Sequence, residues 1–217
     1  VQRQRLTRAA AIRICLPACA SLPPFVDWPS ELAHQVNAGT YLVGGGHEFD
    51  GRALAPMDEL AIAAAARAIR KAGVTSVAIA AVFSPLTDAC EQRGAEIVAN
   101  EHPDARITLS TSLGRIGLLE RENVTLLNAA LLDLAAETTD AFAHALNDSD
   151  LSAKLFVTQN DGTVAPAELA RKFPVFSFAS GPTNSMRGAM FLSGVKDGLV
   201  CDIGGTTMDV GCLRNGF

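Results

Sequence analysis

The chain has 217 residues, of which 48% are hydrophobic and 19% are charged, so it can bury a substantial core and is not compositionally disordered. Its 18 basic and 23 acidic residues leave a formal charge of −5. Because the basic residues form no stripe, a surface for nucleic acid is not expected. No apolar run reaches the roughly 18 residues that a membrane-spanning helix needs, so no membrane segment is expected either.

The five cysteines are odd in number and irregular in spacing, and they include no C-x-x-C pair. They therefore predict neither a disulfide framework nor a zinc site. We expect them to be small buried thiols of a cytoplasmic protein. The chain starts with Val1 instead of Met and stops at Phe217 soon after an expected strand, which favours a piece of a longer protein.

Residues 1–57 are the least regular part of the sequence. The prolines at 17, 23, 24 and 29 and the glycine run 44–46 interrupt this region. Apolar stretches at 6–15 and 40–43 predict short strands, which we expect to pair in an antiparallel manner. We treat 1–57 as an irregular N-terminal region that precedes a more regular α/β part.

Residues 58–217 alternate between expected helices and strands, joined by loops of a few residues. Asp58 is suited to cap the first helix, and Asp88 with Glu91 resembles a capping box at the second. The expected helices span 58–72, 88–101, 123–146, a short stretch from Pro166, and 181–192. The expected strands span 74–83, 106–110, 154–158, 174–178, 199–203 and 208–213. This order predicts an α/β fold with a mainly parallel sheet, divided into 58–180 and 181–217.

The segment 200–211 (VCDIGGTTMDVG) has the strongest functional pattern. An apolar strand ends in Asp202, and Gly204 and Gly205 then let the backbone N–H groups approach an anion. Thr206 and Thr207 add hydroxyl donors for phosphate oxygens. Carboxylates near phosphate require a cation between them, so Asp202 indicates Mg²⁺ or its water shell.

The same turn has simpler interpretations. Asp209 can serve the cation in the same way as Asp202, or it can cap the turn. Gly-Gly is also common in hairpins that bind nothing. The preceding Ser180-Gly181-Pro182 predicts a helix start with free N–H groups, which is either an anion site or only a capped helix.

Two other groups of residues invite a functional interpretation. His47 with Glu48 and Asp50 forms either a metal cluster or, more simply, a solvated loop. Arg121 is either a substrate clamp or a partner of its neighbours Glu120 and Glu122 in surface ion pairs, which contribute little. We favour the second interpretation in both cases.

The sequence resembles the hydantoinase A and 5-oxoprolinase family over roughly residues 40–217. The most specific stretch is SGPTNSMRGAMFLSGVKDGLVCDIGGTTMDVG, since the family shows an SGP helix followed by D-I-G-G-T-T-x-D-V. The other matching blocks are 45–52, 55–59 and 120–129. That family in turn is similar to the actin, sugar-kinase and heat-shock chaperone ATPases, whose two ribonuclease-H-like halves clasp ATP.

The resemblance implies an incomplete actin-like ATPase fold, with most of the first half and the opening hairpin of the second. It implies that ATP and Mg²⁺ are the cofactors. The phosphate-binding residues would be Gly204, Gly205, Thr206, Thr207, Ser180 and Gly181. Asp202 and Asp209 would hold the metal through water.

For function, the resemblance implies ATP-dependent hydrolysis of a cyclic amide, either hydantoin or 5-oxoproline, by phosphorylation of the amide oxygen. The alternatives are a subunit of an acetone- or acetophenone-type carboxylase, a chaperone-like reactivating ATPase, and a binding domain that has lost catalysis. A hydantoinase B-like partner subunit and an oligomer are also implied. The catalytic residues and the substrate stay open, and the isolated piece is expected to be inactive.

Overall fold

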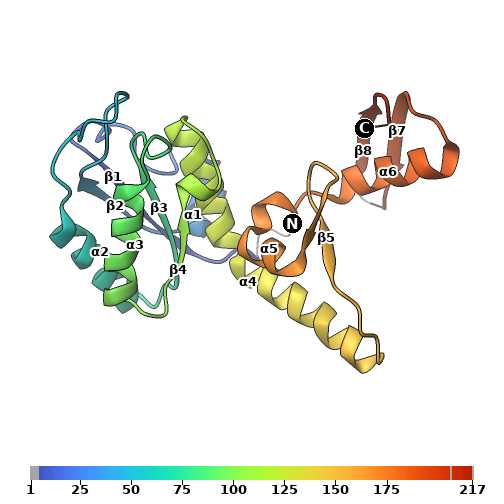
Figure 1. The fold of residues 1–217 in the computed structure, drawn as a ribbon, viewed down its shortest axis with the longest axis horizontal. Helices are drawn as coiled ribbons and strands as arrows, with labels where there is room; N and C mark the ends of the chain where they lie inside the picture. Colours follow the sequence, from blue (N-terminus) through green and yellow to red (C-terminus); the bar gives the residue numbers. More distant parts are fainter. Residues whose placement is uncertain (1–4, 206, 217) are drawn as a thin grey trace. The chain divides into compact units, whose positions relative to one another are not determined.

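The computed structural model describes residues 5–205 and 207–216. These residues form two compact units, 5–134 and 135–216. The division between the units falls inside the long helix α4 (Leu118–Asp148), which contributes to both (Figure 1). The predicted division at residues 58 and 181 stays a prediction. Among the helices of the described residues, none combines the length and the apolar character needed to cross a bilayer.

The first unit is built on a sheet of four parallel strands. These are β1 (Ala9–Leu16), β2 (Asn37–Gly44), β3 (Ser76–Ala81) and β4 (Arg106–Leu109), in the order β2-β1-β3-β4. Every neighbouring pair is parallel. The predicted α/β architecture with a parallel sheet is therefore confirmed for this unit.

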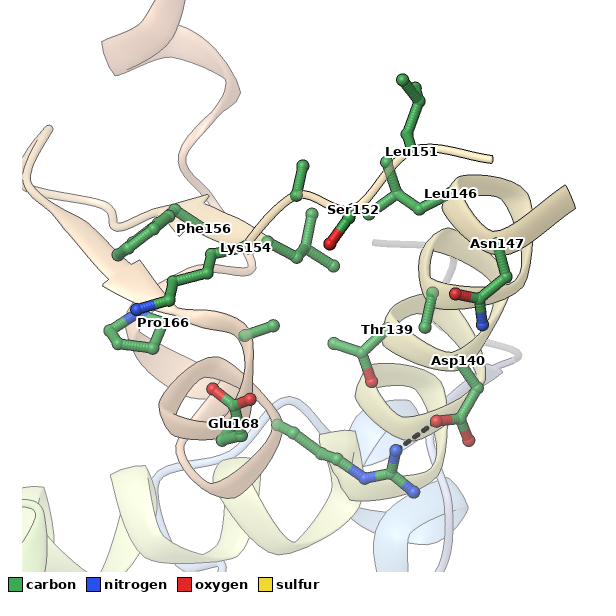
Figure 2. Close-up of a pocket in the computed structure, with 15 residues that line it drawn as sticks. Thr139, Asp140, Leu146, Asn147, Leu151, Ser152, Lys154, Phe156, Pro166 and Glu168 are labelled. Atoms are coloured by element: carbon green, nitrogen blue, oxygen red, sulfur yellow. Dashed lines mark hydrogen bonds and ion pairs between the residues drawn. The ribbon is translucent and has the colours of Figure 1, made fainter. Parts of the chain in front are cut away.

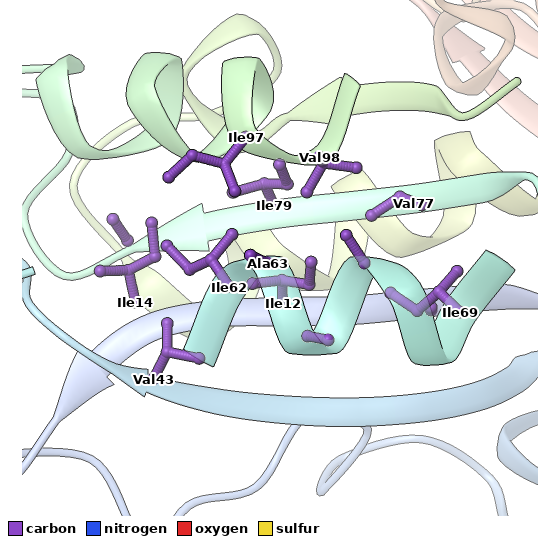
Figure 3. Close-up of a cluster of buried hydrophobic side chains, with 14 of the residues drawn as sticks. Ile12, Ile14, Val43, Ile62, Ala63, Ile69, Val77, Ile79, Ile97 and Val98 are labelled. Atoms are coloured by element: carbon purple, nitrogen blue, oxygen red, sulfur yellow. The ribbon is translucent and has the colours of Figure 1, made fainter. Parts of the chain in front are cut away.

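Helices cover both faces of this sheet. Helices α2 (Glu59–Lys71) and α3 (Ala89–Glu101) lie over one face, where alternate residues of β1 such as Ile12 and Ile14 meet Ile62 and Ile97 (Figure 3). The intervening β1 residues pack on the other face against α4 and α1 (Ser30–Val36). Burial on both faces explains why β1 and β3 are apolar at nearly every position.

The sequence signals at the helix ends hold for α2 but not for α3. The Asp58 carboxylate accepts a hydrogen bond from Ala61 N–H at 2.9 Å, and Gly73 follows the helix with φ of +70°. The predicted capping box of α3 is wrong, because Asp88 makes no side-chain cap bond. The Glu91 side chain is fully buried and bonds to other loops.

Two further expectations are also wrong. Strands β1 and β2 are parallel because helix α1, which the sequence did not suggest, carries the connection between them. Residues 174–176 form a short 3₁₀ helix instead of a strand. Pro174 starts this helix, where its fixed φ is suitable and its missing N–H costs nothing.

Besides the end of α4 and the short 3₁₀ helix at 174–176, the described part of the second unit contains two antiparallel hairpins and the helices α5 and α6. The first hairpin is β5 (Phe156–Thr158) with β6 (Val164–Pro166), and α5 (Ala167–Lys172) follows it. Helix α6 (Gly181–Ser193) leads to the second hairpin, β7 (Gly198–Ile203) with β8 (Met208–Leu213). Thr183 in α6 donates to Asn160 O at 2.7 Å, which joins α6 to the turn of the first hairpin.

Candidate functional site

The β7–β8 hairpin forms a tight turn at the predicted phosphate-binding segment. Gly204 N–H donates to Thr207 O at 2.9 Å, directly after the last strand pair, Ile203 with Met208. Gly204, Gly205 and Thr207 are all exposed, so a ligand can reach the turn, where the Gly205 N–H and the Thr207 hydroxyl are not used by the bond that closes it. The predicted phosphate-binding residue Thr206 lies outside the described residues.

The two predicted metal-binding carboxylates lie opposite each other at this end of the hairpin. Asp202 is paired with Asp209 in the register of the two strands, and both are exposed. Directly opposed residues of antiparallel strands project from the same face, with Cβ atoms about 5 Å apart. The structure therefore brings both carboxylates to one face, next to the glycine turn.

Helix α6 packs on that same face and positions Asp202. Ser185 of α6 donates a hydrogen bond from Oγ to the Asp202 carboxylate. At Gly211, which lies opposite Val200, an added Cβ would come within 1.9 Å of Met186 Sδ. The missing side chain of Gly211 lets the helix approach the strands closely enough for the Ser185–Asp202 bond.

The Ser185–Asp202 hydrogen bond also brings the start of α6 near this face of the hairpin. Gly181 is the first helical residue and Ser185 follows about one turn later, so the bond to Asp202 brings the first turns of α6 beside the end of β7. Ser180 occupies the N-cap position without a side-chain cap bond, and Gly181 is exposed. The predicted residues Ser180 and Gly181 therefore belong to the same local structure as the hairpin.

The donor set at the hairpin fits Mg²⁺. Magnesium prefers oxygen ligands and is commonly held by one or two carboxylates, with water and phosphate oxygens completing its shell. Asp202 and Asp209 supply two carboxylates. No group of three or more His, Cys, Asp or Glu side chains suited to a metal occurs in the described part of the chain. Water and phosphate would therefore supply the other ligands.

Arg121 does not form the surface ion pairs that the sequence suggested. Its side chain is buried, with Nε 2.7 Å from Ser110 Oγ and Nη2 2.6 Å from Ala81 O. Burial lowers the pKa of Arg121, and the nearby Glu91 and Glu122 oppose that shift. Arg121 is buried because the first turns of α4 pack against the carboxyl ends of β3 and β4. This is a tertiary contact, which the neighbouring residues in the sequence do not show.

The buried Glu91 is a residue that the sequence reasoning assigned to the wrong role. It accepts hydrogen bonds from Ser84 Oγ at 2.6 Å and from Thr111 N–H at 3.0 Å. An acidic residue in a first helical turn normally indicates capping, so no local signal distinguishes this Glu. Its fully buried position, with serines and threonines around it, is visible only in three dimensions.

The segment around His47 does not form a metal cluster in the described structure. His47 Nδ1 lies 3.9 Å from Cys90 Sγ, and Asp50 pairs with Arg52 at 2.7 Å. A separate hollow of about 890 Å³ lies in the second unit between α4 and α5, next to the Asp140–Arg171 ion pair (Figure 2). None of the predicted site residues lines this hollow.

Models of known families match most of the chain. A hydantoinase/oxoprolinase model matches residues 121–217, and a model of the hydantoinase/oxoprolinase N-terminal region matches residues 26–102. The uncharacterized protein MJ0964 of Methanocaldococcus jannaschii is 25% identical over 170 residues, which are 76% of this chain and 25% of that protein. The chain therefore spans about a quarter of this curated relative.

Two solved structures share the fold. A nucleotide-free acetone carboxylase structure matches 99% of this chain and 33% of its own chain, with a TM-score of 0.77 and 19% identity. The ATP-dependent caprolactamase of Pseudomonas jessenii matches 95% of this chain and 32% of its own, with a TM-score of 0.71 and 19% identity. The likeness agrees with an actin-like ATPase fold, as the sequence predicts.

Proposed function

Because the chain belongs to the hydantoinase/oxoprolinase family, we propose that it is part of an ATP-dependent hydrolase of a cyclic amide of the hydantoin or 5-oxoproline type. The observation that carries the proposal is the β7–β8 turn. There Gly204 and Gly205 lie exposed, and Asp202 and Asp209 project beside them. This combination suits a polyphosphate and its cation better than it suits a purely structural turn.

Each residue of the turn has a distinct role in this proposal. The Gly205 N–H binds a phosphate oxygen, because the absence of a side chain lets the anion approach the backbone. The Gly204 N–H already donates to Thr207 O, so Gly204 contributes the close approach of the backbone and the shape of the turn. The Thr207 hydroxyl donates to the same group, as Thr206 does in the sequence-based prediction. Ser180 and Gly181 contribute the N–H groups at the start of α6.

Asp202 and Asp209 would hold Mg²⁺, directly or through water. Bound there, the ion would neutralise charge on the phosphates during transfer to the amide oxygen, which makes the amide susceptible to water. The Ser185 hydroxyl holds Asp202 in place. Positioning and charge neutralisation carry most of the catalysis in phosphoryl transfer, so this site needs no nucleophilic side chain.

A second candidate is an ATP-dependent carboxylase that activates a ketone and bicarbonate. The acetone carboxylase structure favours it, since that structure aligns with 99% of the chain. Both candidates use the hairpin in the same way and differ in the group that receives the phosphoryl group. A hydantoinase B-like partner subunit, an oligomeric assembly and a cytoplasmic location also belong to the proposal.

The test is ATP turnover by the full-length gene product, with its partner subunit if one is required. Turnover is measured with hydantoin, with 5-oxoproline, and with acetone plus bicarbonate. Stimulation by a cyclic amide supports the hydrolase, and stimulation by acetone plus bicarbonate supports the carboxylase. Asp202→Asn should lower turnover by about two orders of magnitude or more, as expected when a charge-stabilising group is lost.

The matched control is Cys201→Ser, because Cys201 precedes Asp202 on the same strand and projects from the opposite face. This variant should retain turnover. If Asp202→Asn and Thr207→Ala both turn over ATP at the wild-type rate, the hairpin has no part in the reaction and the proposal fails.

A further inference from the structure

A cavity of about 620 Å³ lies in the first unit at the carboxyl ends of β3 and β4. One wall is the loop after β3, with Leu86 and Thr87, and the other is the loop before α4, with Arg115 and Ile116. In open parallel α/β sheets, ligands bind beyond the carboxyl ends of the strands. None of the residues assigned to nucleotide lines this cavity.

Two fully buried charged side chains, Glu91 and Arg121, form hydrogen bonds to the loops that make these walls. The Glu91 carboxylate accepts from Ala81 N–H at the end of β3, from Ser84 Oγ in the loop that follows, and from Thr111 N–H in the other loop. Arg121 donates through Nη1 to Arg115 O at 2.7 Å and to Ile116 O at 3.0 Å. These bonds fix the backbone of both loops, so the cavity is shaped before a ligand arrives.

The backbone where β3 leaves the sheet is also constrained. Phe83 has φ of +52°, which is unusual for a bulky residue and is retained only where the surroundings impose it. Its carbonyl accepts from Leu86 N–H at 3.0 Å, which closes the turn that forms one wall. Strain of this kind is concentrated at functional sites more than at ordinary surface turns.

The polar side chains that line the cavity differ in whether they already form hydrogen bonds within the protein. The Ser84 and Thr111 hydroxyls already donate to Glu91. The Arg115 side chain is exposed, and its guanidinium makes no hydrogen bond or ion pair among the described residues. The Asp88 carboxylate, also at the cavity, accepts from Gln92 Nε2 at 3.2 Å. Among the described residues of the lining, the Arg115 guanidinium and the Thr87 hydroxyl are therefore the side-chain donors not already in use, beside the apolar Leu86 and Ile116.

We propose that this cavity binds a small organic carboxylate with an apolar body. The Arg115 guanidinium pairs with the carboxylate, the Thr87 hydroxyl donates to it, and Leu86 and Ile116 contact the body. Arginine suits this role because its planar fork matches a carboxylate with two parallel hydrogen bonds. The fixed loops reduce the ordering cost of binding.

The test is an NMR titration of the ¹⁵N-labelled 217-residue chain with 5-oxoproline and with 2-pyrrolidinone, the same lactam ring without a carboxylate. The choice of a lactam carboxylate rests on the proposed function, but the experiment needs no nucleotide. Failure of the hairpin to bind ATP would leave its result unaffected. We expect 5-oxoproline to shift the amide resonances of Ser84, of residues 86–88 and of residues 111–116, and 2-pyrrolidinone to bind about tenfold more weakly or worse.

Arg115→Gln should weaken 5-oxoproline binding by about tenfold or more, because a charge-assisted pair is lost. The matched control Arg52→Gln removes an exposed arginine of the same unit that pairs with Asp50, and it should bind like wild type. Absence of shifts in the two loops, equal binding of both lactams, or wild-type affinity in Arg115→Gln would each overturn the proposal. Thermal unfolding of both variants excludes a folding defect, which the exposed position of Arg115 already makes unexpected.

Discussion

Arg13 on β1 and Glu122 on α4, 109 residues apart, form a bidentate ion pair with almost no exposure to solvent. Arg13 Nε donates to Glu122 Oε1 at 2.7 Å, and Nη2 donates to Oε2. Arg13 also donates to Leu22 O. The pair joins an inner strand of the sheet to the helix that covers it, on the same face as the small residues Ala129 and Ala130.

Glu122→Gln should destabilise the chain strongly. Removing one partner of a buried ion pair costs about 3–5 kcal/mol, because the remaining charge stays buried without compensation. The measurement is the free energy of unfolding from urea denaturation, with Glu120→Gln as control. Glu120 is exposed on the same helix turn, and its substitution should change stability by no more than about 0.5 kcal/mol. Equal effects of the two variants would show that the buried pair has no special role.

Asp133 should contribute a pH-dependent stability. Hydrogen bonding from Arg106 holds the pKa of Asp133 below its ordinary value, and Thr7 adds a second bond at 2.7 Å. A depressed folded-state pKa stabilises the fold above the unfolded-state pKa, near about 3.9, and this contribution is lost as the pH falls through the folded value.

We therefore expect Asp133→Asn to be less stable than wild type at pH 7, by no more than about 1 kcal/mol because the pair is partly exposed. The difference should shrink below about pH 4. Urea denaturation at a series of pH values measures it. A stability difference that stays constant from pH 7 to pH 3 would contradict this origin.

Gly211→Ala should disturb the contact between α6 and the hairpin. The new methyl group would meet Met186 Sδ at 1.9 Å and Cγ at 2.9 Å, so Met186 must move. Overpacking of this kind costs about 1–3 kcal/mol. The readout is hydrogen exchange of the amides of α6 and β7, which should accelerate. Adding Met186→Ala should restore slow exchange; if it does not, the clash is not the cause.

The cysteines should differ sharply in reactivity. Burial raises the pKa of the Cys15 thiol to about 11, and Cys15 is fully buried. Cys201 and Cys212 are exposed, which corrects the expectation that the thiols would be buried. They lie on the hairpin face opposite the one that α6 covers. Native labelling with iodoacetamide at pH 8, read by mass spectrometry, should modify Cys201 and Cys212 first. Labelling of Cys15 at the rate of Cys201 would refute the described burial.

Much of the fold could be predicted because its signals are local. The apolar run at 74–83, bounded by Gly73 and Pro85, indicated a strand buried on both faces, and β3 is that strand. The turn at 204–207 followed from Gly-Gly between two apolar segments. The Asp58 cap of α2 and the SGP start of α6 were also readable from a few neighbouring residues.

The features that escaped prediction depend on contacts between distant segments. Glu91 and Arg121 look like ordinary charged residues near helix starts, yet they are buried because the segments that follow β3 and β4 converge on them. The parallel pairing of β1 with β2 required α1, a helix of seven residues without a side-chain cap bond. In the candidate site, the bond from Ser185 to Asp202 was likewise invisible in the sequence.

The most direct test of the central claim is paramagnetic broadening by Mn²⁺·ATP, followed in the NMR spectrum of the labelled 217-residue chain. This measurement detects even weak binding, since broadening needs only transient proximity to the metal. If the hairpin holds nucleotide, the amide signals of Gly204, Gly205 and their strand neighbours should broaden first. The double variant Asp202→Asn, Asp209→Asn should abolish this selectivity. Broadening that spares residues 202–209, or that persists unchanged there in the double variant, would contradict the account.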